Sequence, residues 1–358
     1  MNSFKPKKLF SMTREPSSDI MNDHGDMYEH FRFEVDPGQS PLRIDKFLVS
    51  RIENLSRNRI QNAAAAGNVL VNNKEVKSNY KVKPGDLISI VMAYAPRETE
   101  LVPEDIPIEV IYEDDHLIVI NKEAGMVVHP GHGNFSGTLV NALAWRFRDI
   151  PLFRSGELRP GLVHRLDKNT SGVIVAAKTE LAMNRIARQF FDRKITRRYI
   201  ALVWGNPEPA EGIITGNIGR HPSNRLKMNV FENGSEGKHA VTHYRIVEKL
   251  GYVNLVECKL ETGRTHQIRV HFEHLGNPLF NDERYGGNRI LKGTTFTKYR
   301  QFVQNCFKLL PRHALHAQSL GFIHPLTGEK LCFEAGLPED MKTVLEKWRK
   351  YLSGREME

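Results

Sequence analysis

The sequence predicts an α+β protein of two domains, in which a small helix-helix-strand domain precedes a larger domain built on a mixed, mainly antiparallel sheet. The chain has 358 residues, 40% hydrophobic and 26% charged, a composition typical of globular proteins with at least one sizeable core. Short apolar runs alternate with a few helical patterns, without a regular βαβ order and without an internal repeat of about 20 to 50 residues. Residues 99–108 are acidic and rich in proline, which predicts a linker between the domains.

The first 30 residues mix Ser, Pro, Met, Asn and acids without periodicity, which predicts a flexible tail. No apolar stretch follows its positive charges, so we expect no secretory signal, and no window approaches the roughly 18 apolar residues of a membrane-spanning helix. The three cysteines are far apart and odd in number, as in proteins of a reducing compartment. We therefore expect a cytoplasmic protein without membrane association, with buried thiols at Cys258, Cys306 and Cys332.

Positive charge is concentrated near the N-terminus. The chain has 51 Lys and Arg against 42 Asp and Glu, and the resulting charge of +9 attracts polyanions such as nucleic acid or acidic membranes. More than half of it lies between residues 41 and 95, where nine Lys and Arg meet four acids. Ser56 is the predicted N-cap of a helix whose first turn carries Arg57, and basic side chains there can meet phosphate. A merely solvated basic face fits the charge equally well.

The same part of the chain, residues 31–98, has the pattern of a compact domain. Its predicted elements are an alternating run FRFEV, helices at 43–55 and 56–67, and strands at 68–72 and 86–93. Three stretches, RIDKFL, SRNRIQNAAAAGNVLVNNKEVK and VKPGDLI, together resemble the small RNA-binding module called the S4 domain. The resemblance implies RNA contacts in this domain, with Lys46, Arg57 and Arg59 as the candidate side chains.

The larger domain, residues 109–352, shows no sign of a cofactor. It opens with predicted strands at 109–121 and 125–130 and ends in an amphipathic helix at 340–352. The Gly-rich GHGNFSG that follows the second strand has neither spacing of a phosphate-binding loop, so we expect no nucleotide cofactor. If RTHQIRVHFEHLG is a helix, His266 lies about 140° round from His271 and cannot share a metal ion with it. Surface or hydrogen-bonded histidines are commoner than zinc sites, so we expect no metal.

A candidate for chemistry lies in GLVHRLDKNTSGVIVAAKT, residues 161–179. Two apolar segments flank a polar loop that carries Asp167. A carboxylate on such a loop is held rigidly and stays accessible, which suits a nucleophile or a general base. Taken alone, an Asx-type turn in which Asp167 binds its own backbone is the commoner explanation.

Two further segments carry candidates. ITRRYIALVWG, residues 195–205, is a predicted strand in which two arginines precede Tyr199, and LETGRTHQIRV, residues 260–270, places Arg264 at the predicted start of a helix. Taken separately, Tyr199 also fits a packing aromatic and Arg264 an exposed cation. Together and in this order, HRLDKNTSG, RRYIALVWG and TGRTHQIR resemble the RluA-type family of RNA pseudouridine synthases. Supporting matches are INKEAGMVVHP, GNPLFNDERYG and LHAQSLGFIHPLTGE.

The resemblance covers nearly all of residues 40–350 and is greatest to the subgroup that modifies large-subunit ribosomal RNA. It implies a catalytic domain of the pseudouridine synthase type, in which Asp167 attacks a flipped-out uridine either at the uracil ring or at the ribose carbon that bears it. The uracil is then detached, rotated and rejoined through carbon. This isomerisation requires no ATP, metal or redox cofactor.

Further roles follow from the resemblance. Arg264 would pair with Asp167 and keep it ionised, Tyr199 would stack on the flipped uracil and move a proton later, and Arg165 would fill the gap that the base leaves. A second basic run, residues 184–199, has six Lys and Arg against one Asp and adds two RNA-contact candidates, Arg197 and Arg198.

Some features leave alternatives open. The family usually has Pro, His and Gly where this chain has Glu123, Asn277 and Asn281, which bears on loop shape and target choice. The basic segment 288–313 either contacts RNA or packs as a helix. We expect a monomer that acts on large-subunit ribosomal RNA; the alternatives are a synthase acting on transfer RNA and a non-catalytic RNA-binding or ribosome-assembly factor.

Overall fold

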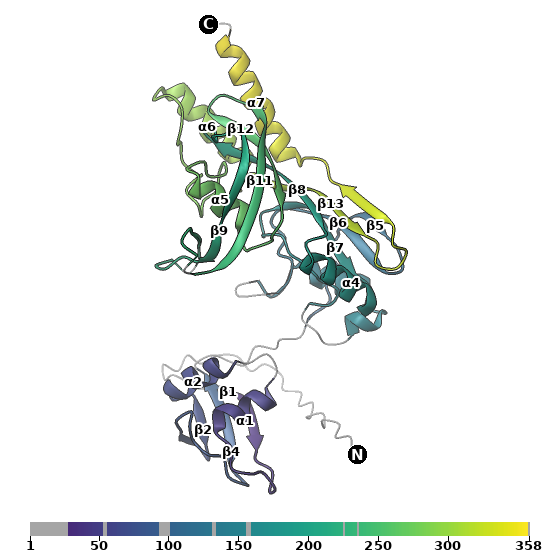
Figure 1. The fold of residues 1–358 in the computed structure, drawn as a ribbon, viewed down its shortest axis with the longest axis vertical. Helices are drawn as coiled ribbons and strands as arrows, with labels where there is room; N and C mark the ends of the chain where they lie inside the picture. Colours follow the sequence, from purple (N-terminus) through teal and green to yellow (C-terminus); the bar gives the residue numbers. More distant parts are fainter. Residues whose placement is uncertain are drawn as a thin grey trace, which may run out of the picture. The chain divides into compact units, whose positions relative to one another are not determined.

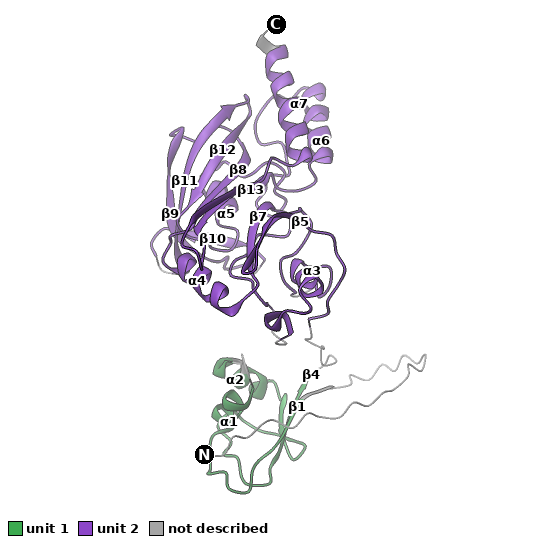
Figure 2. Ribbon diagram, turned by 90° about the vertical axis from the view of Figure 1, so that its right-hand side faces the viewer, with its two compact units in different colours: residues 1–99 green, residues 100–358 purple. Residues whose placement is uncertain are grey.

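The structure is a computed structural model that describes residues 28–52, 56–92, 101–130, 134–154, 159–224, 226–234 and 236–356. The chain forms two compact units, residues 1–99 and 100–358 (Figure 2). Most of the predicted tail lies outside the described residues. Its last three residues belong to the first strand, so regular structure begins at Tyr28 rather than at residue 31.

The N-terminal unit is a four-stranded antiparallel sheet packed against two helices. The strand order is β1-β4-β2-β3, and the buried side chains of Phe47, Ile60 and Ile88 lie in its core. Both predicted helices and both predicted strands are present. The elements are β1 (Tyr28–Glu34), α1 (Ile44–Arg51), α2 (Arg57–Ala65), β2 (Val69–Val71), β3 (Lys74–Glu75) and β4 (Leu87–Met92) (Figure 1).

One buried carboxylate joins the two helices of this unit. Asp45 on α1 is fully buried and accepts hydrogen bonds from Arg43, Gln61 and Arg57, at 2.9 to 3.1 Å. Burial would raise the pKa of Asp45, but these donors, Arg43 foremost, hold it far below its usual value. Arg57, a predicted RNA contact, therefore also fastens α2 to α1, although its side chain stays half exposed.

The second unit is built on a ten-stranded sheet. Nine strands run in the order β10-β9-β11-β12-β8-β13-β7-β6-β5, and β14 pairs with β13. The strands are β5 (Glu109–Glu113), β6 (Leu117–Lys122), β7 (Ser171–Ala177), β8 (Thr196–Trp204), β9 (Glu211–Arg220), β10 (Met228–Phe231), β11 (Lys238–Lys249), β12 (Val253–Leu260), β13 (Leu315–Ile323) and β14 (Lys330–Glu334). The helices are α3 (Leu139–Arg146), α4 (Glu180–Phe191), α5 (Gln267–His274), α6 (Thr297–Leu309) and α7 (Glu339–Glu356), with a short 3-10 helix at Pro151–Arg154.

The predicted fold class is confirmed. Among the strand pairs, β13 and β7 run parallel and the others run antiparallel, so the sheet is mixed and mainly antiparallel. Strand β13 lies between β7 and β8, although it comes more than 110 residues later in the chain than either end of β8. This insertion brings the loop before β7 close to the residues of β8.

The basic segment 288–313 packs as a helix. Its central part forms α6, which lies beside α7 (Figure 2). Buried Tyr299, Val303 and Cys306 of α6 pack with Trp348 of α7 and with Trp204 of β8. The amphipathic run predicted at the C-terminus is therefore α7, and its apolar face covers one end of the sheet.

Two predictions of local structure are wrong. Residues 125–130 do not form a strand, because the carbonyls of Val127 and Val128 accept hydrogen bonds from the first-turn amides of α3. Cys332 is exposed on β14, which pairs only with β13, whereas Cys258 and Cys306 are buried as predicted.

The predicted linker is attached to the second unit at residues 102–104. Asn141 on α3 donates from its side chain to the carbonyl of Val102 and accepts the amide of Glu104 at its own carbonyl. The Glu104 carboxylate in turn accepts the amide of Gly137. Residues 102–104 are thus anchored to the start of α3. In the described part of the chain, no helix has the length and apolar character needed to cross a bilayer.

Candidate active site

The loop that carries Asp167 is closed by backbone contacts. The amide of Thr170 donates to the carbonyl of Asp167 at 3.0 Å, and the strand β7 begins at the next residue. The fully buried Lys122 donates from Nζ to the carbonyls of Glu123, Met126 and Lys168. Because the backbone makes this turn, the Asp167 carboxylate is available for other partners, unlike in the Asx-type turn considered from the sequence.

The cation beside Asp167 is Arg269, not Arg264. Arg269 lies on α5 and donates from Nη1 to Oδ2 of Asp167 at 2.9 Å, whereas Arg264 donates from Nε to the carbonyl of His239 on β11. The predicted pair of Asp167 and Arg264 is therefore wrong. Helix α5 begins three residues after Arg264, so Arg264 lies in the preceding turn and only Arg269 is on the helical turn facing the loop.

The side chain of Gln267 fixes where α5 begins. Its Oε1 accepts the amide of Arg264 and the hydroxyl of Thr262, while its Nε2 donates to the carbonyl of Val241. His266, the residue before the helix, has a left-handed backbone with φ of 57°. These contacts fix the residue at which α5 begins and so decide which arginine faces Asp167. The motif TGRTHQIR contains two arginines, and the sequence alone did not distinguish them.

Arg269 is itself held by a second carboxylate that the sequence interpretation missed. Asp282, 1% exposed, accepts two hydrogen bonds from Arg269, from Nε at 2.7 Å and from Nη2 at 2.9 Å. Its Oδ1 also accepts the amides of Arg284 and Tyr285. Burial would raise the pKa of Asp282, but the bonds from Arg269 lower it below its usual value. This bidentate pair fixes the plane of the guanidinium that meets Asp167.

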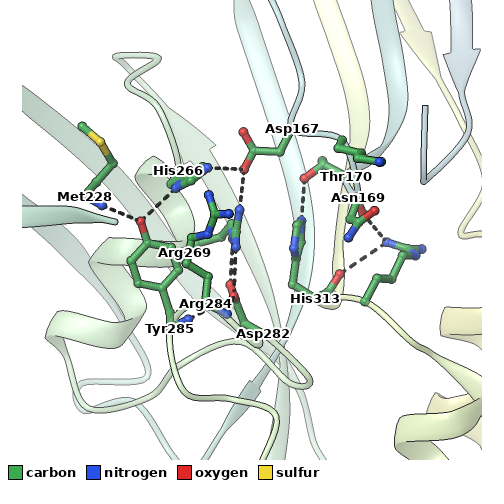
Figure 3. Close-up of polar contacts among 12 residues, drawn as sticks. Asp167, Asn169, Thr170, Met228, His266, Arg269, Asp282, Arg284, Tyr285 and His313 are labelled. Atoms are coloured by element: carbon green, nitrogen blue, oxygen red, sulfur yellow. Dashed lines mark hydrogen bonds and ion pairs between the residues drawn. The ribbon is translucent and has the colours of Figure 1, made fainter. Parts of the chain in front are cut away.

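A chain of hydrogen bonds orders His266 beside the same carboxylate (Figure 3). The amide of Met228 donates to the Tyr285 hydroxyl at 2.9 Å, and that oxygen lies 2.9 Å from Nδ1 of His266. Because the Tyr285 oxygen accepts from Met228, we assign the Tyr285 hydroxyl as the donor to Nδ1 of His266. The ring hydrogen of His266 is then on Nε2. Nε2 lies 3.9 Å from Oδ2 of Asp167.

These surroundings keep Asp167 ionised. Burial would raise its pKa, but His266, Arg269 and His313 in their protonated forms together lower the pKa below its usual value. At neutral pH only Arg269 of these carries a charge, because burial lowers the pKa of His266 to about 4 and that of His313 to about 3. The carboxylate Oδ1 accepts no hydrogen bond from any described residue, so it is available to react.

Residues before β13 hold Asn169 and Thr170, the part of the loop that follows Asp167. His313 lies with Nε2 2.9 Å from the Thr170 hydroxyl, and Arg312 donates to the carbonyl of Asn169 at 3.0 Å (Figure 3). Arg312 also makes two hydrogen bonds to Asp340 at the start of α7. The segment before β13 therefore supports the loop of Asp167, a role that no sequence motif indicated.

A hollow of about 580 Å³ opens beside Asp167 and collects most of the predicted site residues. Tyr199 on β8 is 8% exposed and lines it, and burial raises the pKa of its hydroxyl. Successive side chains of a strand point to opposite faces, so Arg197 also lines the hollow whereas the exposed Arg198 does not. The predicted residues that line it are Arg165, Asp167, Arg197, Tyr199 and Arg264.

The remaining candidates lie in the N-terminal unit or carry structural contacts. Lys46 is exposed on α1, Arg57 is bound to Asp45, and the side chain of Arg59 lies outside the described residues. Asn277 donates to the carbonyl of Trp204, and Asn281 adopts a left-handed φ of 56° and donates to two carbonyls at the end of α6. Among the described residues, no group of three or more His, Cys, Asp or Glu could hold a metal ion.

Comparison with known proteins identifies both units. The family described as RNA pseudouridylate synthase matches residues 116–274, and the S4 domain matches residues 42–88. An uncharacterized RNA pseudouridine synthase of Chlorobaculum parvum is 50% identical over 318 residues, covering 88% of this chain and 97% of the relative. Ribosomal large subunit pseudouridine synthase D of Zymomonas mobilis is 41% identical and covers 85% and 93%.

A solved structure agrees with these matches. Human RNA Pseudouridylate Synthase Domain Containing 4 is similar with a TM-score of 0.50 and 25% identity, covering 67% of this chain and 93% of that one. The similarity to relatives extends over both the S4 domain and the domain that holds Asp167. This protein, an α+β chain with an ionised, arginine-bound aspartate beside a hollow, belongs to the RNA pseudouridine synthase family.

Proposed function

We propose that the protein converts uridines of large-subunit ribosomal RNA to pseudouridine, with Asp167 as the nucleophile. The observation that supports this mechanism best is the position of Asp167: its carboxylate is ionised by Arg269 and borders the hollow that Tyr199 lines. The choice of RNA rests on relatives named ribosomal large subunit pseudouridine synthase D, which are 41% to 42% identical over 85% to 86% of the chain.

One oxygen of the Asp167 carboxylate is bound by Arg269, and the other is available to react. Oδ2 accepts the hydrogen bond from Arg269, and Oδ1 faces no donor among the described residues. Oδ1 would attack the uracil ring or the ribose carbon of the bound uridine, and both routes begin from the ionised form. Arg269 lowers the cost of an ionised carboxylate in a largely buried place, so it acts by positioning Asp167 and keeping it charged.

The other predicted residues receive roles from their places in the hollow. Tyr199 would stack on the flipped uracil, because it lies on the apolar side near Leu260 and Ile268. Arg165 is exposed at the edge and would occupy the gap in the RNA. Arg197 and Arg264 would contact the RNA backbone at the entrance. Arg198 can contact RNA only outside the hollow, on the other face of β8.

The N-terminal unit would bind RNA through phosphates. We assign these contacts to Lys46, Arg57 and Arg59, and the match of residues 42–88 to the S4 domain supports RNA as their partner. We further propose that the protein acts as a monomer on ribosomal RNA or a precursor particle in the cytoplasm.

The decisive experiment compares the wild type with Asp167→Asn on in-vitro transcribed large-subunit ribosomal RNA and on transfer RNA. Wild type should form pseudouridine in the ribosomal RNA, and the variant should form none while binding the RNA with unchanged affinity. Equal product from the variant would refute the role of Asp167. Product only in transfer RNA would move the substrate to that class, and binding without product by the wild type would indicate a non-catalytic factor.

A further inference from the structure

A second hollow, of about 620 Å³, lies on the other side of Asp167. The two hollows share five lining residues, and Asp167, His266 and Arg269 form the border between them. The second hollow extends from this border to the segment before β13 and to the turn that follows Asp282 (Figure 3). Neither the predicted roles nor the family resemblance assigns it a ligand.

The lining of the two hollows differs in kind. Tyr199, Phe190 and Phe191 line the first hollow, and Phe191 is 78% exposed there. No Phe, Tyr or Trp is among the described residues that line the second hollow, which instead holds asparagines and histidines. Burial lowers the pKa of two of these histidines, His129 and His313, to about 4 and about 3, so they are neutral at pH 7. Aromatic faces suit a base, whereas amides, imidazoles and cations suit a ribose and its phosphates.

Three cations that line the second hollow pair with no carboxylate among the described residues: Arg165, which also borders the first hollow, Arg284 and Lys168. Arg284 is exposed and its guanidinium contacts no partner among the described residues, while Lys168 donates only to the side chain of Asn134. The buried cations of this hollow are already paired, Arg269 with Asp167 and Asp282 and Arg312 with Asp340. Arg165 is shared with the first hollow, so Arg284 and Lys168 are the cations that serve a phosphate in the second hollow alone.

Arg284 is fixed relative to the nucleophile through a single carboxylate. Asp282 Oδ1 accepts the Arg284 amide at 3.1 Å and also the Nη2 donor of Arg269 at 2.9 Å. Arg269 in turn binds Asp167. The turn that presents Arg284 and the guanidinium that holds Asp167 thus share one anchor, so the backbone of Arg284 is fixed relative to Asp167 and its side chain extends from that point.

We infer that the second hollow binds the ribose and phosphate of the target uridine and of the nucleotide next to it, with Arg284 and Lys168 on the phosphate. The bond that breaks joins the base to the ribose, so a base stacked beside Tyr199 places that bond at Asp167 and the sugar-phosphate on the opposite side. This inference rests on the proposed function, because it divides a single RNA substrate between the two hollows.

The test measures pseudouridine formation by Arg284→Ala and Lys168→Ala as a function of salt. Each variant should raise KM about 10-fold with kcat within about 3-fold of wild type, and each should lower the slope of log KM against log salt by about one. Arg284→Lys should keep the wild-type slope. Lys330→Ala, which removes an exposed cation of β14 outside both hollows, should match wild type in both constants.

A neighbouring acid provides the opposite test. Glu283 is exposed and lines the same hollow, so Glu283→Gln should lower KM where Arg284→Ala raises it. The Glu283→Gln variant also tests phosphate binding in the second hollow if Arg284→Ala fails to fold. Once the target uridine is mapped, replacing its adjacent phosphate by a neutral methylphosphonate should raise KM more for wild type than for Arg284→Ala, in which only Lys168 still contacts that phosphate.

Three outcomes overturn the inference: unchanged KM and salt slope in both cation variants, a loss of kcat at unchanged KM, or additive effects of Arg284→Ala and the methylphosphonate. Failure of the proposed function looks different, because the wild type itself would then make no pseudouridine in any RNA.

Discussion

Arg269 binds Asp167 across 102 residues of chain, through one hydrogen bond of 2.9 Å from Nη1 to Oδ2. The rest of the guanidinium is occupied by Asp282, so one cation serves two carboxylates in a largely buried place. Such an arrangement is sensitive to loss of the cation, because both carboxylates would remain in surroundings of low polarity without compensation.

Replacing Arg269 should therefore be severe. Arg269→Ala should lower the free energy of unfolding by about 3 to 5 kcal/mol and kcat by about 100-fold or more, since it removes the partner of two buried carboxylates. Arg264→Ala, by contrast, removes an exposed side chain bound to a backbone carbonyl and should cost less than about 1 kcal/mol. Urea unfolding and single-turnover rates measure both. Equal losses in the two variants would show that the ion pair seen here does not govern catalysis.

The aromatic ring of Tyr199 should matter more than its hydroxyl. The ring is buried in the apolar cluster with Leu166 and Ile268, and the hydroxyl has no hydrogen-bond partner among the described residues. Tyr199→Phe should keep activity within about 3-fold, while Tyr199→Leu should lose about 10- to 100-fold, the size of one base stacked on an aromatic ring. Steady-state kinetics on ribosomal RNA decides it. A large loss in Tyr199→Phe would instead assign the hydroxyl to proton transfer.

Removing the N-terminal unit should weaken RNA binding and make it less dependent on salt. A chain that begins at residue 99 lacks Lys46, Arg57 and Arg59, whose proposed phosphate contacts would release counterions. Each lost contact should lower the slope of log affinity against log salt by about one. Filter binding at several salt concentrations provides the comparison, and an unchanged slope would exclude this unit from phosphate binding.

His164 should make stability depend on pH. Its Nε2 accepts the amide of Val175, and its ring stacks on Phe190 with centroids 4.6 Å apart. Burial lowers its pKa from 6.5 to about 3, so between these values the unfolded chain binds a proton that the folded chain does not. The free energy of unfolding should thus fall as the pH is lowered below about 6.5, by up to about 1.4 kcal/mol per pH unit from this residue.

The variant His164→Gln isolates that contribution, because its amide oxygen can accept the same bond without titrating. Urea unfolding at pH 7.5, 6 and 5 should show a weaker dependence on pH in the variant than in wild type. The same dependence in both proteins would mean that His164 titrates near its ordinary pKa.

Patterns within one element were predicted well from the sequence. The apolar run within 195–205 forms β8, and the loop before β7 holds Asp167 as expected. Both depend on neighbours a few residues away, for which spacing is informative. The parts that failed depend on distant partners. Residues 125–130 have the pattern of a strand, but the carbonyls of Val127 and Val128 accept hydrogen bonds from the amides of α3 instead.

The sequence could not show whether Arg264 or Arg269 pairs with Asp167, because this also depends on contacts with distant residues. Both lie in one short motif, and only the contacts of Gln267 and the left-handed His266 decide where α5 begins. Asp282, which holds Arg269, belongs to a separate segment with no recognised role. A carboxylate 1% exposed must have a partner, but its burial is a property of the folded chain.

The position of β13 has a consequence for when the protein becomes active. Among the described strands, β5, β6 and β7 join the rest of the sheet only through β13, and Asp167 and Tyr199 come from opposite sides of that join. A chain emerging from the ribosome cannot complete the sheet until residues 315–323 have left the exit tunnel. Asp167 and Tyr199 therefore reach their final positions in the sheet only after residues 315–323 have been synthesised.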